Sequence, residues 1–276
     1  MLILSAMNTT IPLTRRALLK ASSGALLATA LWPGALRAAD AQRKNLRFAV
    51  INDLHIYDDQ CSAYFEPLVK QINTEDIDLL LIAGDLTNDS HIEQVDLFKT
   101  LFAKIKVPFR VVPGNHDLCQ GHKAWDDAFK DCSNYVFDMA DWQFIALDTC
   151  DGTNYQKITI LSSTLDYAKT ALAKLDPKKP LVLFTHFPLG ENVLYRPTNA
   201  DDVLDLFKKH NLRAAFSGHF HGFTEHTCRD AVLTTNCCCS RHVSNHDGTK
   251  EQGYFILACD DGRLTRTFVE YKPKPA

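Results

Sequence analysis

Five apolar segments of this chain each run directly into a short block of residues that commonly bind metal ions. The segments read RFAVINDLH, DLLLIAGD, FRVVPGNHD, LVLFTHFP and AAFSGHFH, and each has the length and composition of a buried strand. The blocks supply seven candidate metal ligands: Asp53, His55, Asp85, Asn115, His186, His219 and His221. Because loops that leave the carboxyl ends of parallel strands meet at one edge of a sheet, we expect these side chains to converge there.

The residue types at these positions suit a pair of metal ions. Asp53 and His55 are two residues apart at a strand end, so we expect their side chains to share a face and hold one cation, and His219 and His221 repeat that spacing. Asp85 has the two oxygens needed to bridge cations about 3.5–4 Å apart. Imidazoles combined with oxygen donors, without a matched set of cysteines, favour manganese, iron or zinc.

Each candidate ligand also has a purely structural interpretation. A single aspartate can cap a turn, and a single histidine near an apolar run is more often a hydrogen-bonded core or surface residue. Taken one at a time, the structural interpretation is favoured. Structural needs alone do not explain seven residues of metal-binding types at five strand ends, so the pattern as a whole favours a metal centre.

Apolar spacing along the chain predicts alternating strands and helices. Helices are expected at 63–74, 92–106 and 163–175, and two adjacent strands between 135 and 148. From residue 223 onward the chain is expected to be rich in short strands. Early parallel strand–helix units and late antiparallel strands predict a layered α/β sandwich, in which two mixed β-sheets are flanked by helices.

The start of the second helix carries a capping signal. Ser90 is the expected N-cap, with Glu93 completing a capping box. Ile92 is expected to begin the buried stripe of this helix.

Residues 1–41 differ from the rest of the chain and predict an export signal. Arg15 and Arg16 precede a mild apolar run, 21–31, and the segment closes with Ala39-Asp40-Ala41, a small-x-small cleavage pattern. The paired arginines followed by Leu-Leu-Lys are similar to a twin-arginine signal, which would make the export machinery a partner and carry the chain out of the cytoplasm in folded form. An ordinary secretory signal that happens to hold two arginines is the alternative. Residues 42–276 are expected to form one domain, periplasmic or secreted.

Charge and hydropathy argue against nucleic-acid binding and against a stable membrane anchor. The leader carries four basic side chains and one acidic one, a net of +3, so its removal takes the formal charge from −3 to −6. An acidic chain without a Lys/Arg-rich stretch argues against nucleic-acid binding. No segment reaches the roughly 20 apolar residues of a spanning helix, so no stable membrane anchor is expected.

All nine cysteines follow the leader, and an odd number leaves at least one unpaired within the chain. An oxidising compartment permits disulfides, but the sequence does not give their pairing. The run Cys237-Cys238-Cys239 has no second cluster at zinc-site spacing, so small apolar core residues, with one bridge at most, are the favoured interpretation.

The five blocks, in this order and spacing, resemble the calcineurin-like metallophosphoesterases. The motifs that carry the resemblance span Asp53 to His221 and read Asp53-Leu54-His55, Gly84-Asp85, Gly114-Asn115-His116-Asp117, His186 and Gly218-His219-Phe220-His221. No single block is specific, whereas all five in sequence are. The Gly-Asn-His-Asp form and the modest length are most similar to the small bacterial phosphodiesterase branch.

The resemblance implies a role for each position. The first metal is expected on Asp53, His55, Asp85 and His221, and the second on Asp85, Asn115, His186 and His219. His116 is expected near the leaving group, with Asp117 orienting its ring. The implied activity is phosphodiester hydrolysis of a small molecule by a hydroxide that bridges two divalent or trivalent ions (Mn, Fe or Zn). A phosphomonoesterase of the same fold and a non-catalytic metal-binding scaffold are the alternatives.

Several other polar and aromatic residues are expected in loops that could reach a substrate: Tyr57, His122, Tyr195, Arg196, Arg241, His242 and His246. For each of them taken alone, a structural role is favoured.

Overall fold

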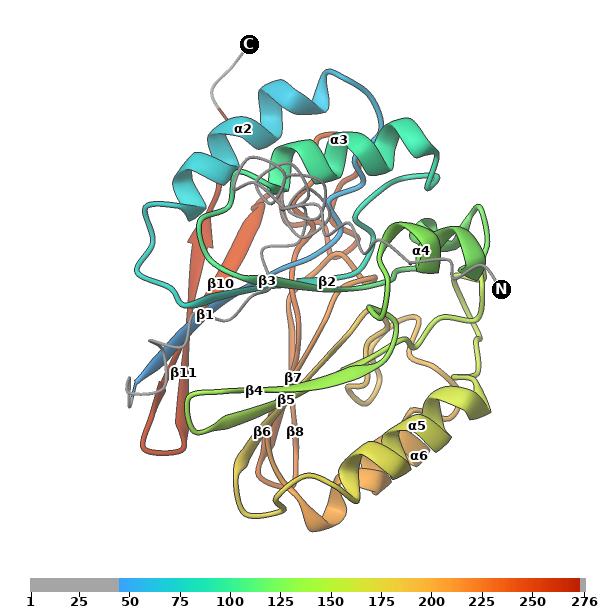
Figure 1. Cartoon of the computed structure of the whole chain (residues 1–276), viewed down its shortest axis with the longest axis vertical. Helices are drawn as coiled ribbons and strands as arrows, with labels where there is room; N and C mark the ends of the chain where they lie inside the picture. Colours follow the sequence, from blue (N-terminus) through green and yellow to red (C-terminus); the bar gives the residue numbers. More distant parts are fainter. Residues whose placement is uncertain (1–44, 274–276) are drawn as a thin grey trace, which may run out of the picture. The chain divides into compact units, whose positions relative to one another are not determined.

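The computed structural model describes residues 45–273, in which two mixed β-sheets pack face to face with helices on both outer sides (Figure 1). The predicted leader, residues 1–41, lies outside the described residues. The first sheet has the strand order β11 (Arg263–Glu270), β10 (Gly253–Asp260), β1 (Leu46–Ile51), β2 (Leu79–Ala83) and β3 (Phe109–Val112). The second sheet has the order β4 (Tyr135–Met139), β5 (Trp142–Leu147), β6 (Pro180–Thr185), β7 (Asn211–Ser217), β9 (Ala231–Thr235) and β8 (Thr224–Cys228). The predicted layered α/β sandwich is confirmed.

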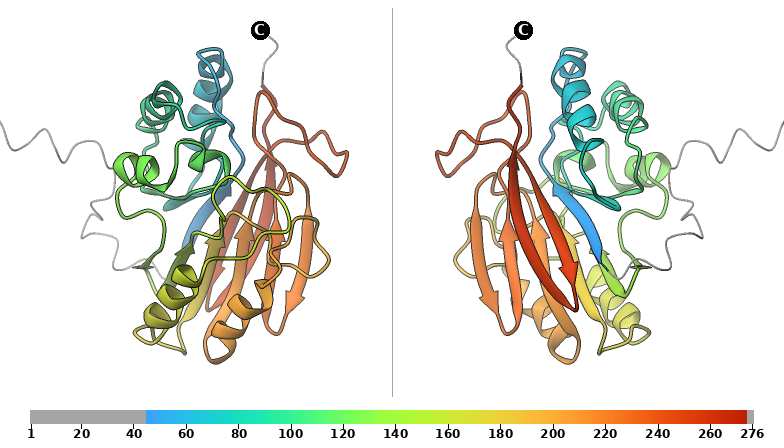
Figure 2. Two further views of the ribbon diagram at one scale, coloured as in Figure 1. Left: turned by 90° about the vertical axis from the view of Figure 1, so that its right-hand side faces the viewer. Right: turned by 90° about the vertical axis from the view of Figure 1, so that its left-hand side faces the viewer.

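The strands that carry the candidate site run parallel within each sheet. β1, β2 and β3 are parallel neighbours, and so are β5, β6, β7 and β9. Antiparallel strands add to these parallel blocks. Figure 2 shows the late strands β10 and β11, in red, beside β1, in blue, where β10 pairs antiparallel with β1. The late strands therefore complete both sheets and do not form a sheet of their own.

Alternation along each strand separates the layers of the core. In β1, Phe48 and Val50 point into the space between the sheets, whereas Ala49 and Ile51 pack on the helical side. The ring of Phe48 meets that of Phe144, from the second sheet, edge-on with centroids 5.5 Å apart. A strand buried on both faces needs a continuous apolar run, and this requirement explains the sequence LLLIA of β2.

Helices cover the outer faces of both sheets. α2 (Cys61–Ile72) and α3 (Ile92–Phe102) pack on the first sheet, and α5 (Ser162–Leu172) and α6 (Ala200–Leu206) pack on the second. The helices α2, α3 and α5 lie where the apolar spacing predicted them. The short helices α4 (His122–Ala128) and α6 were not predicted, and neither were the single turns of 3-10 helix η1 (His116–Leu118) and η2 (Phe207–Lys209).

The capping prediction at the start of α3 is wrong. His91 occupies the N-cap position and its side chain makes no capping hydrogen bond. The hydroxyl of Ser90 instead accepts a hydrogen bond from the amide of Gln120 in a neighbouring loop. Ile92, expected in the buried stripe, is 62% exposed, because the buried face of this helix begins at Gln94.

The nine cysteines are all free thiols, so the single bridge allowed for the cysteine run is not formed. Cys237, Cys238 and Cys239 are fully buried and follow the end of β9. Their interpretation as small core residues is confirmed. Among the described residues, no helix combines the length and apolar character needed to cross a bilayer.

Candidate metal centre

The seven candidate ligands lie in the loops that leave the carboxyl ends of five strands. β1, β2 and β3 of the first sheet and β6 and β7 of the second end immediately before these loops. All seven side chains are buried, with exposed fractions between 0% and 7%. Because the two sheets pack face to face, the loops from both reach the same point, and the seven side chains converge as predicted.

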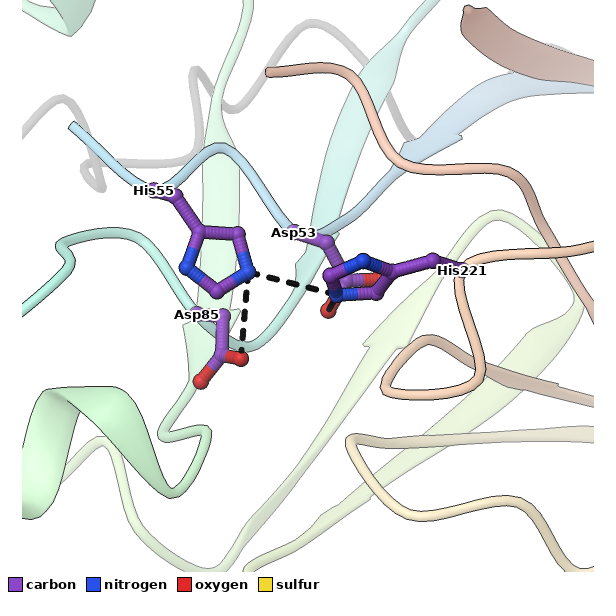
Figure 3. A group of neighbouring side chains, drawn as sticks. All are labelled: Asp53, His55, Asp85 and His221. Carbon is purple, nitrogen blue, oxygen red and sulfur yellow. Dashed lines mark hydrogen bonds and ion pairs between the residues drawn. The ribbon is translucent and has the colours of Figure 1, made fainter. Parts of the chain in front are cut away.

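Four of the seven side chains form a first group, drawn in Figure 3: Asp53, His55, Asp85 and His221. Nε2 of His55 lies 3.2 Å from Nε2 of His221 and 3.5 Å from Oδ2 of Asp85. Nε2 of His221 lies 3.3 Å from Oδ1 of Asp53. The ligand atoms all lie within 4.8 Å of one another, which is the separation expected of atoms that surround one cation.

A second group lies on the other side of Asp85 and contains His186, His219 and Asn115. Nε2 of His186 lies 3.4 Å from Oδ2 of Asp85, 3.2 Å from Nδ1 of His219 and 3.2 Å from Oδ1 of Asn115. The same oxygen of Asp85 therefore faces both groups. This position suits a carboxylate that bridges two ions, through one oxygen where the sequence predicted the use of both.

The two pairs of ligands spaced two residues apart behave differently. Asp53 and His55 enter the same group, as their spacing predicted. His219 and His221 do not: His221 joins the first group and His219 the second. The expectation that this pair shares one group is wrong, and its division between two groups is the one that the family resemblance implied.

The alternation of side chains along a strand does not apply to either pair, because these residues are not in strands at all. Five of the candidate ligands follow the ends of their strands and adopt left-handed backbone conformations, with φ between 46° and 64°: Asp53, His55, Asp85, His219 and His221. Such a conformation costs a non-glycine residue on the order of 1–2 kcal/mol, so the surrounding structure has to impose it. The amides of Leu54 and His55 both donate to the carbonyl of Asp85, at 2.8 and 3.0 Å, and hold the two loops together.

Two glycines allow the close approach of these loops. A Cβ at Gly84, where φ is +84°, would lie 2.4 Å from Nδ1 of His186, and a Cβ at Gly114 would lie 2.0 Å from Oδ1 of Asp85. Both distances are far below a van der Waals contact. The glycines of these motifs are therefore required by packing against the candidate ligands.

The hydrogen bonds of the histidines fit a bound cation. His186 donates from Nδ1 to the carbonyl of Ala83 at 3.0 Å, and His219 donates from Nε2 to the carbonyl of Tyr155 at 2.7 Å. Because a carbonyl only accepts, each ring, when neutral, carries its proton on the outer nitrogen and directs a lone pair inward. The inward nitrogens lie 3.2 Å apart, where two lone pairs repel unless a positive charge lies between them. The donor set therefore fits metal ions.

Burial and neighbouring charges move the pKa values of these histidines in different directions. Burial lowers the pKa of His186, but Asp85 outweighs it and brings the value to about 9. Burial and the neighbouring His186 lower the pKa of His219 to about 3. Burial likewise lowers the pKa of His55 to about 4, against the pull of Asp85. In the second group, one ring of the facing pair is protonated at neutral pH and the other is neutral.

His116 lies at the edge of the centre and is held by a main-chain carbonyl. Its Nδ1 donates to the carbonyl of Asn88 at 2.6 Å, and its ring packs edge-on against His55 with centroids 4.7 Å apart. Its amide donates to Oδ1 of Asp85 at 3.0 Å. The second ring nitrogen is left for the pocket that His116 helps to line.

Asp117 does not orient His116, and that expectation is corrected. Its carboxylate accepts hydrogen bonds from the amides of Leu86, Thr87 and Gly114 at 2.9–3.0 Å, and from the hydroxyl of Thr87. The bonds from Leu86 and Thr87 tie the loop after β2 to the loop after β3, whereas the bond from Gly114 lies within the loop after β3. Asn88 orients the ring instead, through a carbonyl that every residue type possesses, so the sequence carries no signal for it.

A pocket of about 440 Å³ opens over the two groups. Five of the candidate ligands line it together with His116: His55, Asp85, Asn115, His219 and His221. The other lining residues come from three loops: Tyr155, Tyr195, Val243, Ser244, Asn245 and His246. Tyr155 was missed in the sequence because nothing in the Asp-Gly-Thr-Asn-Tyr stretch marks it as lining a site. The volume is within the range of small-molecule sites.

Comparison with known families gives a match over most of the described chain. Residues 46–223 match the model of the calcineurin-like phosphoesterase family. The match begins at β1 and ends just after the last candidate ligand.

Individual relatives agree with this match. A protein of Fibrobacter succinogenes named "Probable cyclic nucleotide phosphodiesterase" is 28% identical over 198 residues, which cover 65% of this chain and 74% of that protein. A protein of Arcobacter nitrofigilis named "Probable glycerophosphodiester phosphodiesterase GpdQ" is 31% identical over 179 residues, which cover 60% of this chain and 65% of that protein. The solved structure of the purple acid phosphatase PPD1 from yellow lupin superimposes with a TM-score of 0.63 and 17% identity, covering 83% of this chain and about half (52%) of that one, and so supports the fold.

Proposed function

Because this chain belongs to the calcineurin-like phosphoesterase family, we propose that its metal centre hydrolyses phosphodiesters of small molecules. The observation that carries the proposal is the placement of Asp85, whose Oδ2 faces a group of ligand side chains on either side. The names of the two relatives described above, both phosphodiesterases, favour a diester over a monoester.

We assign the first metal to Asp53, His55, Asp85 and His221, and the second to Asp85, Asn115, His186 and His219. The set holds four imidazoles, two carboxylates and one amide oxygen, and no thiolate, which favours manganese, iron or zinc. Two divalent ions would bring four positive charges to two carboxylates. The net positive charge that remains would attract a phosphoester anion.

When bound, two such ions supply an activated water and offset charge on the phosphoryl oxygens. The protein's own residues do the rest. Asp85 holds the two halves of the centre at a fixed separation. His116, when protonated, can give a proton from its free ring nitrogen to the departing oxygen, while the carbonyl of Asn88 keeps the ring in place. A serine or cysteine nucleophile is not needed for this reaction.

Charge in the pocket also favours a diester. Among the residues lining the pocket in the described part of the chain, none is lysine or arginine. A phosphomonoester carries one more negative charge than a diester at neutral pH and would have to rely on the metal ions alone to balance it.

The test compares bis(p-nitrophenyl) phosphate with p-nitrophenyl phosphate on the purified, metal-loaded protein. We expect kcat/KM to be at least tenfold higher for the diester. A preference for the monoester would support the phosphomonoesterase alternative. If the metal-saturated protein hydrolysed neither ester, the scaffold alternative would replace the proposal.

We further propose that residues 1–41 direct the domain formed by 42–276 out of the cytoplasm through the twin-arginine machinery. Arg15 and Arg16 before a mild apolar run support this assignment. A substrate outside the cytoplasm would then be an external phosphoester. Replacing both arginines by lysine should abolish export if the twin-arginine route is used and leave it unchanged if the segment is an ordinary secretory signal.

A further inference from the structure

Two tyrosines line the pocket beside His219. The ring of Tyr195 lies 5.2 Å from that of His219, and the carbonyl of Tyr155 accepts the hydrogen bond that orients the same histidine. The two tyrosine rings are 6.3 Å apart and inclined by 64°. Rings at this mutual angle offer a face and an edge to a third planar group, which is the arrangement that aromatic clusters favour.

One tyrosine has an exposed ring and the other has an unusual backbone conformation. Tyr155 is 55% exposed, and its hydroxyl accepts a hydrogen bond from Nε2 of Gln156 at 3.1 Å. Tyr195 has a φ of 67°, a conformation that is a genuine outlier for a bulky residue. The loop that imposes it is held on its far side by Arg196, whose Nε donates to the carbonyl of Leu189 at 3.0 Å. Strain of this kind gathers at ligand-binding positions.

His116 contacts one group of candidate ligands, and Tyr195 contacts the other. His116 packs against His55, a member of the first group, whereas Tyr195 packs against His219, a member of the second. If His116 serves the departing oxygen, the group beside the tyrosines is the ester substituent that remains on phosphorus.

We propose that Tyr155 and Tyr195 form a subsite for a planar aromatic substituent, such as a nucleobase or an aryl ring, on the part of the diester that is retained after hydrolysis. The inference rests on the proposed function, because it names the substrate class of the same site. The absence of lysine and arginine from the lining residues of the described chain is consistent with an uncharged planar group at this position. Stacking on aromatic side chains tolerates every base, since every base has a π face.

The experiment uses two substrates that share a leaving group. Phenyl p-nitrophenyl phosphate and methyl p-nitrophenyl phosphate both release p-nitrophenolate and differ only in the retained substituent. The quantity measured is the ratio of kcat/KM for the phenyl ester to that for the methyl ester, on the metal-loaded, full-length chain. We expect the unaltered protein to favour the phenyl ester.

Three variants and one control test the residues. Tyr155→Ala removes a ring but keeps the carbonyl that orients His219, and Tyr195→Asn removes a ring but tolerates the left-handed backbone. Each should lower the ratio about fivefold, the effect of one aromatic contact. Tyr195→Phe should retain the ratio. The matched control is Tyr57→Ala, because Tyr57 is 50% exposed but does not line the pocket.

An unchanged ratio in both ring-deleted variants, with both esters still hydrolysed, would overturn the subsite and leave the proposed function standing. An equal loss for the two esters would also overturn it, because that result indicates a merely structural role. If the metal-loaded protein hydrolysed neither ester, the proposed function would fail. The subsite is then tested by calorimetry with phenylphosphonate and methylphosphonate: a preference for the phenyl compound that both variants lose supports it, and equal binding overturns it.

Discussion

Asp85 is common to both groups of candidate ligands. Its Oδ2 atom faces His55 of the first group and His186 of the second. Replacing Asp85 by asparagine should lower metal content from two ions per chain and reduce kcat/KM for a diester on the order of a thousandfold, the equivalent of several kcal/mol of transition-state stabilisation. Elemental analysis and diester hydrolysis measure both effects. The control is Asp127→Asn, since Asp127 is an exposed residue paired with Lys123. Full metal content and activity in Asp85→Asn would refute the bridging role.

His116 contacts the centre without belonging to either group of ligands. Replacing it by glutamine should leave the metal content at two ions and lower kcat between a hundredfold and ten-thousandfold, the range expected for loss of a general acid. His91→Gln is the matched control, because His91 is exposed and lies outside the pocket. Loss of metal from His116→Gln would instead identify the residue as a ligand.

At the scale of single residues, the sequence predicted which side chains come together better than it predicted the groups that orient them. The convergence of all seven candidate ligands could be predicted, because strand ends and residue chemistry are both visible in the sequence. The carbonyls of Asn88, Ala83 and Tyr155 that orient the histidines have no sequence signal, since any residue at those positions would supply the same atom. Asp117 was visible in the sequence, but its contacts depended on where two loops would cross.

Among the structural elements, the loops after β2 and β3 are joined in part through Asp117. Its buried carboxylate accepts three amide hydrogen bonds and one hydroxyl hydrogen bond. Asp117→Ala should lower the free energy of unfolding by about 3 kcal/mol, because it leaves several buried donors without an acceptor. Urea unfolding of the metal-free protein measures this loss without a contribution from ligand binding. A loss below about 1 kcal/mol would mean that the loops are held together by other contacts.

The strands were predictable and the loops between them were not. Buried parallel strands have to be continuous apolar runs, so β1, β2, β3, β6 and β7 could be read from the chain. The pairing of β10 with β1 joins residues about 200 positions apart and left no local mark. The start of α3 was mispredicted because the hydroxyl of Ser90 accepts a hydrogen bond from the amide of Gln120 in a distant loop. This tertiary contact replaces the capping hydrogen bond that the local sequence predicted.

For the molecule as a whole, metal binding and proton binding compete for the same site. The pKa of His186 in the folded chain is about 9, above the ordinary value of 6.5. The protonated ring therefore stabilises the metal-free fold fully below pH 6.5, and this contribution is lost as the pH rises through about 9. Urea unfolding of metal-free protein should show stability falling across this window.

The metal-loaded protein should behave in the opposite way over the same range. Because ligands have to be deprotonated to bind a cation, the extra stability given by added manganese should grow between pH 6.5 and 9. Comparing loaded with chelator-treated protein at each pH isolates this increment. An increment that did not vary with pH would show that binding releases no proton, against the assignment of His186 as a ligand.

We expect seven side chains from two sheets to hold a pair of metal ions with Asp85 between them. Anomalous diffraction from crystals of the manganese-loaded protein would locate the ions. We expect two peaks about 3.5–4 Å apart, one within the group of Asp53, His55 and His221 and the other within the group of Asn115, His186 and His219. A single peak, or peaks that do not flank the Asp85 carboxylate, would show that these side chains do not hold two ions in this way.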